Sequence, residues 1–280
     1  MKEFVESFYN ASKAKRSAIP RIDELPYYIT WPLVYVLKQG NVKPVWLSVI
    51  SFLGGVLFLF TLVWKPEALN PLIPSLLLLI RILLDYADGQ LARYAFQTSN
   101  LGALYDLIAD FFFVFLLYIS IAWVVIVAEE LPLWVTISLT ITAFISHLTT
   151  ATVSSFLNRL ASDKAHTQQE IAMEFVRVFP NDFPEEPRYS KKLSVMNSLF
   201  LFTWRVISIY VLAILVGNRQ IKYRQFSAHL SAFFEYSIHL FVLLFIVFLG
   251  HSFLYFLAFE ILALATCVAL LLFLRIISFK

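Results

Sequence analysis

The sequence predicts an all-α membrane protein, a polytopic helical bundle, and three observations support that prediction. Hydrophobic residues make up 60% of the 280-residue chain. Charged residues make up only 15%, well below the ~25% of soluble domains. Several stretches are apolar, uncharged and longer than the roughly 18 residues needed to cross a bilayer as a helix. We therefore expect six transmembrane helices, an N-terminal interfacial segment and one further apolar segment, 197–217, whose placement is ambiguous.

Residues 1–44 are expected to form a cytoplasmic or interfacial segment, and residues 45–280 a single transmembrane domain. The first segment mixes polar and aromatic residues, and its four prolines break any long helix. Such a segment suits the membrane surface, and a partly ordered tail is the alternative. The charged N-terminus does not resemble a cleavable signal peptide. Its basic residues are too sparse for nucleic-acid binding, so no nucleic-acid partner is expected.

The first three spans are expected at 45–64, 72–94 and 102–127. Tryptophans lie at both ends of the first span, where they would anchor it at the membrane interfaces. A short polar loop, FQTSN, joins the second span to the third. Charged residues occupy the end of the second span and the beginning of the third, which is unusual at membrane depth.

The fourth span is expected at 131–158, which contains no Asp, Glu, Lys or Arg. A polar, charged cytoplasmic loop should follow at about 159–196. The next segment, 197–217, is apolar enough to cross the membrane, but Arg205 interrupts it and basic residues flank both sides. Because cytoplasmic loops carry the excess of Lys and Arg, this pattern favours an interfacial or re-entrant segment.

The last two spans are expected at 236–249, extended backward through 226–234, and at 252–277. They should form a tight hairpin at Gly250. Glu260 lies inside the last span and needs a partner that the sequence does not identify. Six spans place both termini and the basic segments in the cytoplasm, whereas a seventh would place the C-terminus outside.

Four carboxylates distinguish the stretch from residue 85 to residue 110. Asp85 and Asp88 are three residues apart and share a helix face; Asp106 and Asp110 are four apart and share another. A charge at the centre of a membrane helix costs ~2.5–3.5 kcal/mol, so four acids are hard to explain as chance. Arg93 adds a positive charge, and small residues on the same faces leave room for a ligand. Since hard cations prefer carboxylate oxygens, the pattern predicts a divalent-metal site beside a phosphate site.

Written out, the stretch reads Asp85-x2-Asp88-Gly89-x2-Ala92-Arg93-x8-Gly102-x3-Asp106-x3-Asp110. In every fixed position and gap it resembles the motif of the CDP-alcohol phosphotransferase family of integral membrane enzymes. That family often carries Pro-Asn-x-x-Thr at the start of the preceding helix, where this chain has PVWLS, from Pro44 to Ser48. The resemblance implies transfer of a substituted phosphate from a CDP-linked alcohol to an acceptor hydroxyl, with release of CMP, in phospholipid biosynthesis.

The resemblance also implies roles for single residues. Asp85, Asp88 and Asp106 would bind Mg²⁺ or Mn²⁺, as two ions. Asp110 would join them and act as the general base. The nucleotide and phosphate contacts would come from Gly89, Ala92, Arg93 and Gly102.

The partners implied are a CDP-linked alcohol, with CDP-diacylglycerol as one candidate, an alcohol acceptor, membrane lipids and a second copy of the chain in a homodimer. The active site would lie in the domain 45–280 and face the cytoplasm. Either the donor or the acceptor would be the lipid, because the motif serves both directions of this chemistry.

Polar residues outside the motif could form an acceptor pocket. Arg81 lies one turn before Asp85, so it either pairs with that carboxylate or contacts a substrate phosphate. His147, Thr150 and Ser154 form a stripe along the fourth span, which must face protein or a water-filled cavity. Hydrogen bonds between helices are the alternative explanation of this stripe.

Two other functions fit parts of the sequence. Intramembrane acids also mark the ion paths of cation- or proton-coupled transporters. Transporters commonly contain internal repeats and place such acids near the midplane, but this chain has no evident repeat and its acids gather near one surface. A non-catalytic scaffold of the same fold is the other alternative, although an inactive relative would be expected to have lost at least one of the four acids.

Overall fold

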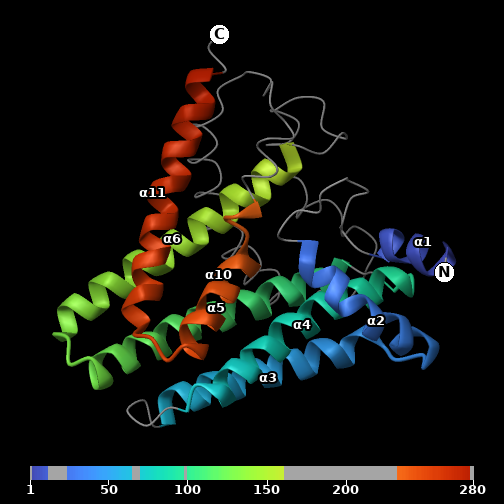
Figure 1. The fold of residues 1–280 in the computed structure, drawn as a ribbon, viewed down its shortest axis with the longest axis horizontal. Coiled ribbons are helices and arrows are strands. Elements are labelled where there is room, and N and C mark those ends of the chain that lie inside the picture. Colours follow the sequence, from blue (N-terminus) through green and yellow to red (C-terminus); the bar gives the residue numbers. More distant parts are fainter. Residues whose placement is uncertain (1, 12–23, 65–69, 98–99, 161–231, 278–280) are drawn as a thin grey trace, which may run out of the picture. The chain divides into compact units, whose positions relative to one another are not determined.

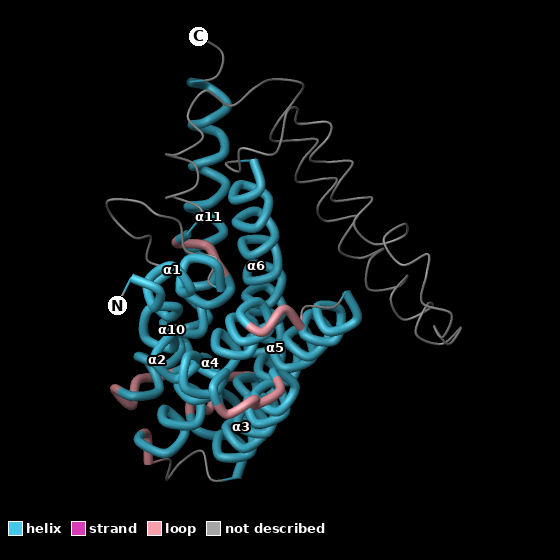
Figure 2. Tube along the Cα trace, turned by 90° about the vertical axis from the view of Figure 1, so that its right-hand side faces the viewer, coloured by secondary structure: helices cyan, strands magenta, loops and turns pink. Residues whose placement is uncertain are grey.

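The computed structural model describes residues 2–11, 24–64, 70–97, 100–160 and 232–277. Within these ranges the regular elements are all helices (Figure 2). The expected loop at about 159–196 lies outside the described residues except for its first two positions, and the ambiguous segment 197–217 lies entirely outside them. The described part therefore supports an all-helical protein.

The chain divides into two compact units, the first formed by residues 1–145 and 236–261 and the second by residues 146–235 and 262–280. The division falls within two long helices, α6 and α11. The helices are α1 (Lys2–Ala11), α2 (Leu25–Gln39), α3 (Pro44–Trp64), α4 (Leu72–Tyr94), α5 (Asn100–Ala128), α6 (Leu133–Leu160), α10 (Tyr236–Phe248) and α11 (Phe253–Ile277) (Figure 1).

Most of the expected spans coincide with a helix to within two residues at each end. The bounds of α4 are the same as those expected, and α3, α5, α6 and α11 differ by one or two residues. The backward extension of the fifth span lies outside the described residues except for 232–234, and there the backbone turns at residues 233–235 before α10 begins. The apolar run through this point is broken by Glu235, whose backbone N–H donates to the carbonyl of Ala232 at 3.4 Å.

Four of the described helices are long and apolar enough to cross a membrane. The segments are Pro44–Trp64, Ile108–Ala128, Leu133–Ser154 and Phe253–Phe273. Helix α10 is apolar but has only 13 residues, about 20 Å at ~1.5 Å per residue. In α3 many large apolar side chains are exposed, with Trp46 at 60% and Phe60 at 56%. Such a surface suits hydrocarbon, and the protein is a polytopic helical membrane protein.

Helix α4 occupies a central place in the first unit, because it contacts α1, α2, α3 and α10. Leu78 and Ile82 of α4 lie in a core cluster with Phe58 and Leu62 of α3 and Leu117 of α5. Helix α3 also contacts α5. The residues of the site lie on α4 and α5. Because α3 packs against both of these helices, it holds them in place.

The described parts of the N-terminal segment form two short helices, α1 and α2. Pro26 lies in the first turn of α2, where a proline is tolerated, whereas the helix continues through Pro32. The buried Gln90 side chain of α4 accepts a hydrogen bond from Thr30 at 2.6 Å and donates one to the Tyr27 carbonyl at 3.1 Å. These two bonds fix α2 against the motif-bearing part of α4.

The hairpin between α10 and α11 forms where it was expected. Gly250 adopts a φ of 64°, in the left-handed region that glycine enters without steric cost. Glu260 of α11 has its partner on α10: His239 Nδ1 and Glu260 Oε2 lie 2.7 Å apart, and both side chains are fully buried. The hairpin therefore buries a polar pair inside an apolar helix pair, where an acid with no partner would be costly.

Candidate active site

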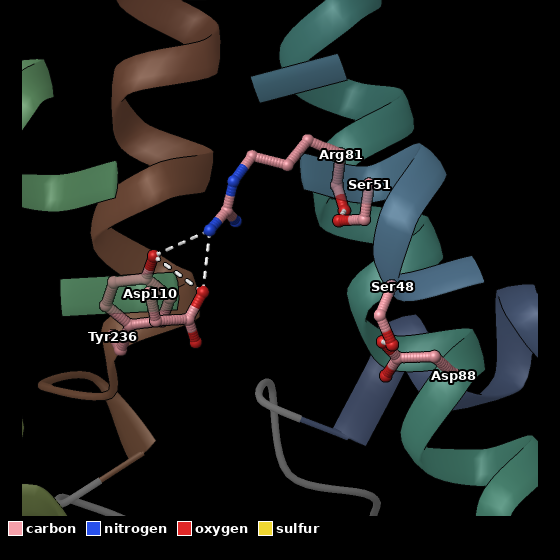
Figure 3. A network of polar contacts seen from close by, with 6 residues as sticks. All are labelled: Ser48, Ser51, Arg81, Asp88, Asp110 and Tyr236. Atoms are coloured by element: carbon pink, nitrogen blue, oxygen red, sulfur yellow. Dashed lines mark hydrogen bonds and ion pairs between the residues drawn. The ribbon is translucent and has the colours of Figure 1, made fainter. Parts of the chain in front are cut away.

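An ion pair joins the two acid-bearing helices. Arg81 Nη2 of α4 lies 2.6 Å from Asp110 Oδ1 of α5. The Arg81 side chain is buried and that of Asp110 is half-buried. Arg81 was expected to pair with Asp85 or to contact a substrate phosphate, and the hydrogen-bonded carboxylate is instead that of Asp110. Figure 3 shows the guanidinium reaching across from α4 to this carboxylate.

Three of the four motif acids come together. One carboxylate oxygen from each of Asp85, Asp106 and Asp110 lies within 4.8 Å of the other two. Asp85 comes from α4 and the other two from α5, and the Asp106 side chain is exposed. Like charges at this distance repel one another, so the arrangement requires nearby positive charge. Arg81 supplies one positive charge against three acids.

Asp88 is held by a residue of α3. Ser48 Oγ donates to Asp88 Oδ2 at 2.6 Å, and the Asp88 side chain is buried (Figure 3). No contact of Ser48 was expected from the sequence. Ser48 occupies the position where the related motif has threonine, and the hydroxyl that the two residue types share could have indicated this bond. The bond fixes one Asp88 oxygen and leaves the other, Oδ1, free of contact with Ser48.

The residues expected to bind nucleotide and phosphate lie on the same two helices. Arg93 Nε donates to the carbonyl of Ala11 in α1, and its guanidinium lies 5.8 Å from the Tyr27 ring. A Cβ on Gly89 would lie 3.4 Å from Arg93 Nη1, so the glycine leaves room beside the guanidinium. Ala92 is half-buried in the last turn of α4, and Gly102 lies in the first turn of α5.

Tyr236, which the sequence did not indicate, completes the contacts around Asp110, and Gly55, which was expected only to allow close helix packing, contacts Arg81. The Tyr236 hydroxyl, at the start of α10, lies 3.3 Å from Arg81 Nη2 and 3.4 Å from Asp110 Oδ1 (Figure 3). Gly55 of α3 lies against the Arg81 side chain. Tyr236 is 126 positions from Asp110, so no spacing rule could link them.

The other residues of the expected acceptor pocket belong to the second unit. His147, Thr150 and Ser154 are all buried in α6. The Thr150 hydroxyl donates within its own helix, to the carbonyls of Ser146 at 2.9 Å and His147 at 3.0 Å. This bond accounts for one hydroxyl of the stripe, and the acceptor-pocket role stays a prediction.

The donor atoms of the cluster suit a hard divalent cation. Three carboxylates whose oxygens lie within 4.8 Å of one another provide the oxygen ligands that Mg²⁺ and Mn²⁺ prefer. A bound cation would also offset the repulsion among the acids. The residues present therefore fit a metal site.

The fold and this cluster define an integral membrane protein with an acidic site shared by two of its helices. The chain belongs to the CDP-alcohol phosphatidyltransferase family, whose sequence model matches residues 41–216. The chain is 38% identical over 96 residues to a protein of Streptomyces coelicolor named cardiolipin synthase (CMP-forming). That match covers 33% of this chain and 42% of the relative. No solved structure matches the chain.

Proposed function

We propose that this protein transfers a substituted phosphate from a CDP-linked alcohol to the hydroxyl of an acceptor alcohol and releases CMP. The observation that carries the proposal is the approach of the Asp85, Asp106 and Asp110 carboxylates to within 4.8 Å. These acids occupy the motif positions within the part of the chain that matches the family, 41–216. The name of the Streptomyces coelicolor relative, which describes it as CMP-forming, agrees with CMP as the leaving product.

The proposed chemistry gives three of the four acids the role of metal ligands and the fourth the role of proton acceptor. Asp85, Asp88 and Asp106 would hold two Mg²⁺ or Mn²⁺ ions through their carboxylate oxygens. When bound, such ions neutralise pyrophosphate charge and orient the leaving group. The Ser48 hydroxyl fixes one Asp88 oxygen, so the other oxygen has a defined direction.

Asp110 would accept the proton of the acceptor hydroxyl. As the hydroxyl oxygen bonds to the phosphorus nearest the donor's alcohol, the bond from that phosphorus to the bridging oxygen breaks, and CMP leaves with the bridging oxygen. The proton moves to the Asp110 carboxylate. A base must lie within hydrogen-bond reach of this proton, and half-burial of Asp110 leaves its carboxylate open to an incoming alcohol.

Gly89, Ala92 and Gly102 would leave room for the cytidine, and Arg93 would contact a phosphate of the donor. The guanidinium has terminal nitrogens besides the Nε that binds the Ala11 carbonyl. A planar guanidinium can offer two parallel donors to a phosphate. The N-terminal helix would therefore orient Arg93 while its terminal nitrogens bind the substrate.

We also propose a topology of six spans formed by α3, α4, α5, α6, α10 and α11, with the motif and both termini on the cytoplasmic side. The basic residues near the ends of the chain support this orientation. A homodimer remains the expected assembly. Cysteine labelling from each side of sealed vesicles and mass measurement in detergent would test the two points separately.

The proposed activity predicts that the purified protein releases CMP in lipid–detergent micelles containing Mg²⁺ or Mn²⁺. CDP-diacylglycerol and CDP-linked small alcohols would each be offered with a panel of soluble and lipid acceptors. Metal-dependent CMP release that requires both donor and acceptor is the expected result, and the productive pair identifies which partner is the lipid. A folded, metal-binding protein that releases no CMP with any pair would count against the proposal.

Arg93→Ala is expected to weaken donor binding more than metal binding. Loss of a charge-assisted phosphate contact should raise the KM for the CDP donor by about 10-fold or more, because such hydrogen bonds contribute ~1.5–3 kcal/mol. The measurement is donor KM beside a Mn²⁺ titration of the same sample. Arg93→Lys serves as the matched variant, because it keeps the charge but not the paired donors. Equal donor KM in Arg93→Ala and the unaltered protein would remove the phosphate-contact role.

A further inference from the structure

We propose that Arg81 is a positioning residue, which fixes the Asp110 carboxylate from a slot formed by Gly55 of α3 and Phe113 of α5. The inference rests on the proposed function, in which Asp110 accepts the acceptor's proton. Arg81 lies outside the acid motif, and its hydrogen bond to Asp110 crosses from α4 to α5 at 2.6 Å. In this proposal Arg81 acts through Asp110 and does not contact the substrate.

The slot determines the path of the Arg81 side chain. The guanidinium carbon lies 3.8 Å from the centre of the Phe113 ring, a close cation–π contact. On the other helix, a Cβ at Gly55 would lie 3.0 Å from Arg81 Cδ and 3.1 Å from Nε. A methyl group at this position would therefore have to displace the arginine or the Phe113 ring by a few tenths of an ångström.

The backbone at Arg81 is held as well. Ser51 of α3, one turn before Gly55, donates its hydroxyl to the Arg81 carbonyl at 3.0 Å (Figure 3). Ser51 is buried, and so is the Arg81 side chain. One helix thus fixes both the main chain and the side chain of the arginine. A long side chain ordinarily has many rotamers, and here its direction is set before it reaches Asp110.

The two carboxylate oxygens of Asp110 differ in their contacts with Arg81 and Tyr236. Oδ1 accepts from Arg81 Nη2 at 2.6 Å, and the Tyr236 hydroxyl lies 3.4 Å from the same oxygen. Neither Arg81 nor Tyr236 contacts Oδ2 within hydrogen-bond distance in the described part of the chain. Because Oδ1 is fixed, the plane of the carboxylate is fixed, and Oδ2 is left to face the acceptor hydroxyl.

The glycine pair of α3 supplies a matched test. At Gly54 the nearest atom to an added Cβ is the Leu77 carbonyl oxygen at 3.8 Å, an ordinary contact, whereas at Gly55 the added carbon would press on Arg81 and also lie 3.0 Å from Phe113. We expect Gly55→Ala to lower the kcat for CMP release by about 10-fold or more, because small misplacements of catalytic groups reach ~100-fold effects. Gly54→Ala should stay within about twofold of the unaltered protein, and neither change should alter the donor KM.

A double-mutant cycle separates positioning from a merely structural ion pair. Arg81→Gln should lower kcat strongly in the unaltered background and have little further effect in an Asp110→Asn background, because both changes remove one functional unit. Arg81→Lys, which keeps a charge and a donor, should recover part of the rate. Mn²⁺ titration by electron paramagnetic resonance and the melting temperature provide readouts besides activity.

Several outcomes would overturn the inference. If folded Gly55→Ala and Arg81→Gln proteins have the kcat of the unaltered protein, Asp110 does not need Arg81 to position its carboxylate. A raised donor KM with unchanged kcat in Arg81→Gln would make Arg81 a substrate contact, and additive losses in the cycle would separate it from Asp110. If the unaltered protein releases no CMP, the proposed function itself fails. If the unaltered protein is active and the Arg81 variants have the same kcat, only the inference about Arg81 fails.

Discussion

Asp110→Asn should lower the rate of CMP release by at least about 100-fold, since a general base contributes ~10²–10⁴-fold. The amide of asparagine cannot accept the acceptor's proton, but its oxygen can still accept the hydrogen bond from Arg81 Nη2. The fold should therefore survive, and Mn²⁺ should still bind through the remaining acids. The measurement is kcat for CMP release at saturating donor and acceptor, with melting temperature and Mn²⁺ affinity from the same preparation.

Glu130→Gln is the control for this change. Glu130 is an exposed acid in the turn that follows α5, so the same conversion of carboxylate to amide should leave the rate within about twofold, as surface changes usually have small effects. An Asp110→Asn protein that turns over as fast as the control would mean that another group takes the proton. In that case the inference about Arg81 would fall with it.

The acid cluster could be predicted because its spacing obeys helix geometry. Residues three or four apart share a helix face, and a short loop brings the end of one helix near the beginning of the next. These two rules suffice to bring Asp85 near Asp106 and Asp110, as the structure has them. The same rules apply only within one helix or between two helices that are consecutive in the chain.

The partner of Arg81 could not be predicted from those rules. Along α4 the nearest acid is Asp85, and local spacing therefore favoured that partner. The actual direction of the side chain depends on Gly55 and Phe113, which lie on other helices. Packing between helices is set by all of their side chains together, so a pattern within one helix cannot reveal which carboxylate an arginine will reach.

Contacts of the C-terminal hairpin were equally hidden from the sequence. Hydropathy identified the last two apolar helices but not the turn at residues 233–235, since Phe233 and Phe234 continue the apolar run. Glu260 signalled that a polar partner must exist, yet His239 lies 21 positions away on another helix. A membrane span restricts which residue types face lipid, and it leaves the choice of buried partners to the fold.

Asp85→Asn should raise the dissociation constant for Mn²⁺ by about 10-fold or more and lower CMP release by at least about 100-fold. Even partners that only orient a metal ligand cost ~10–100-fold in affinity when removed, so loss of a ligating carboxylate should cost no less. Asp85 is the one acid of α4 in the close cluster, and its loss leaves the two acids of α5 without an α4 partner there. Mn²⁺ titration by electron paramagnetic resonance measures the affinity without relying on turnover.

The matched control for this second change is Glu129→Gln. Glu129 lies just after α5, and both of its carboxylate oxygens accept from the Ser252 hydroxyl, at 2.5 and 2.6 Å. Its neutralisation changes the total charge by the same amount but leaves the cluster intact, so Mn²⁺ affinity should not move. Chelation of divalent cations should silence the unaltered protein, and added Mg²⁺ or Mn²⁺ should restore it. Equal Mn²⁺ affinity in Asp85→Asn and Glu129→Gln would place the metal elsewhere, and CMP release that persists under chelation would remove the metal from the reaction.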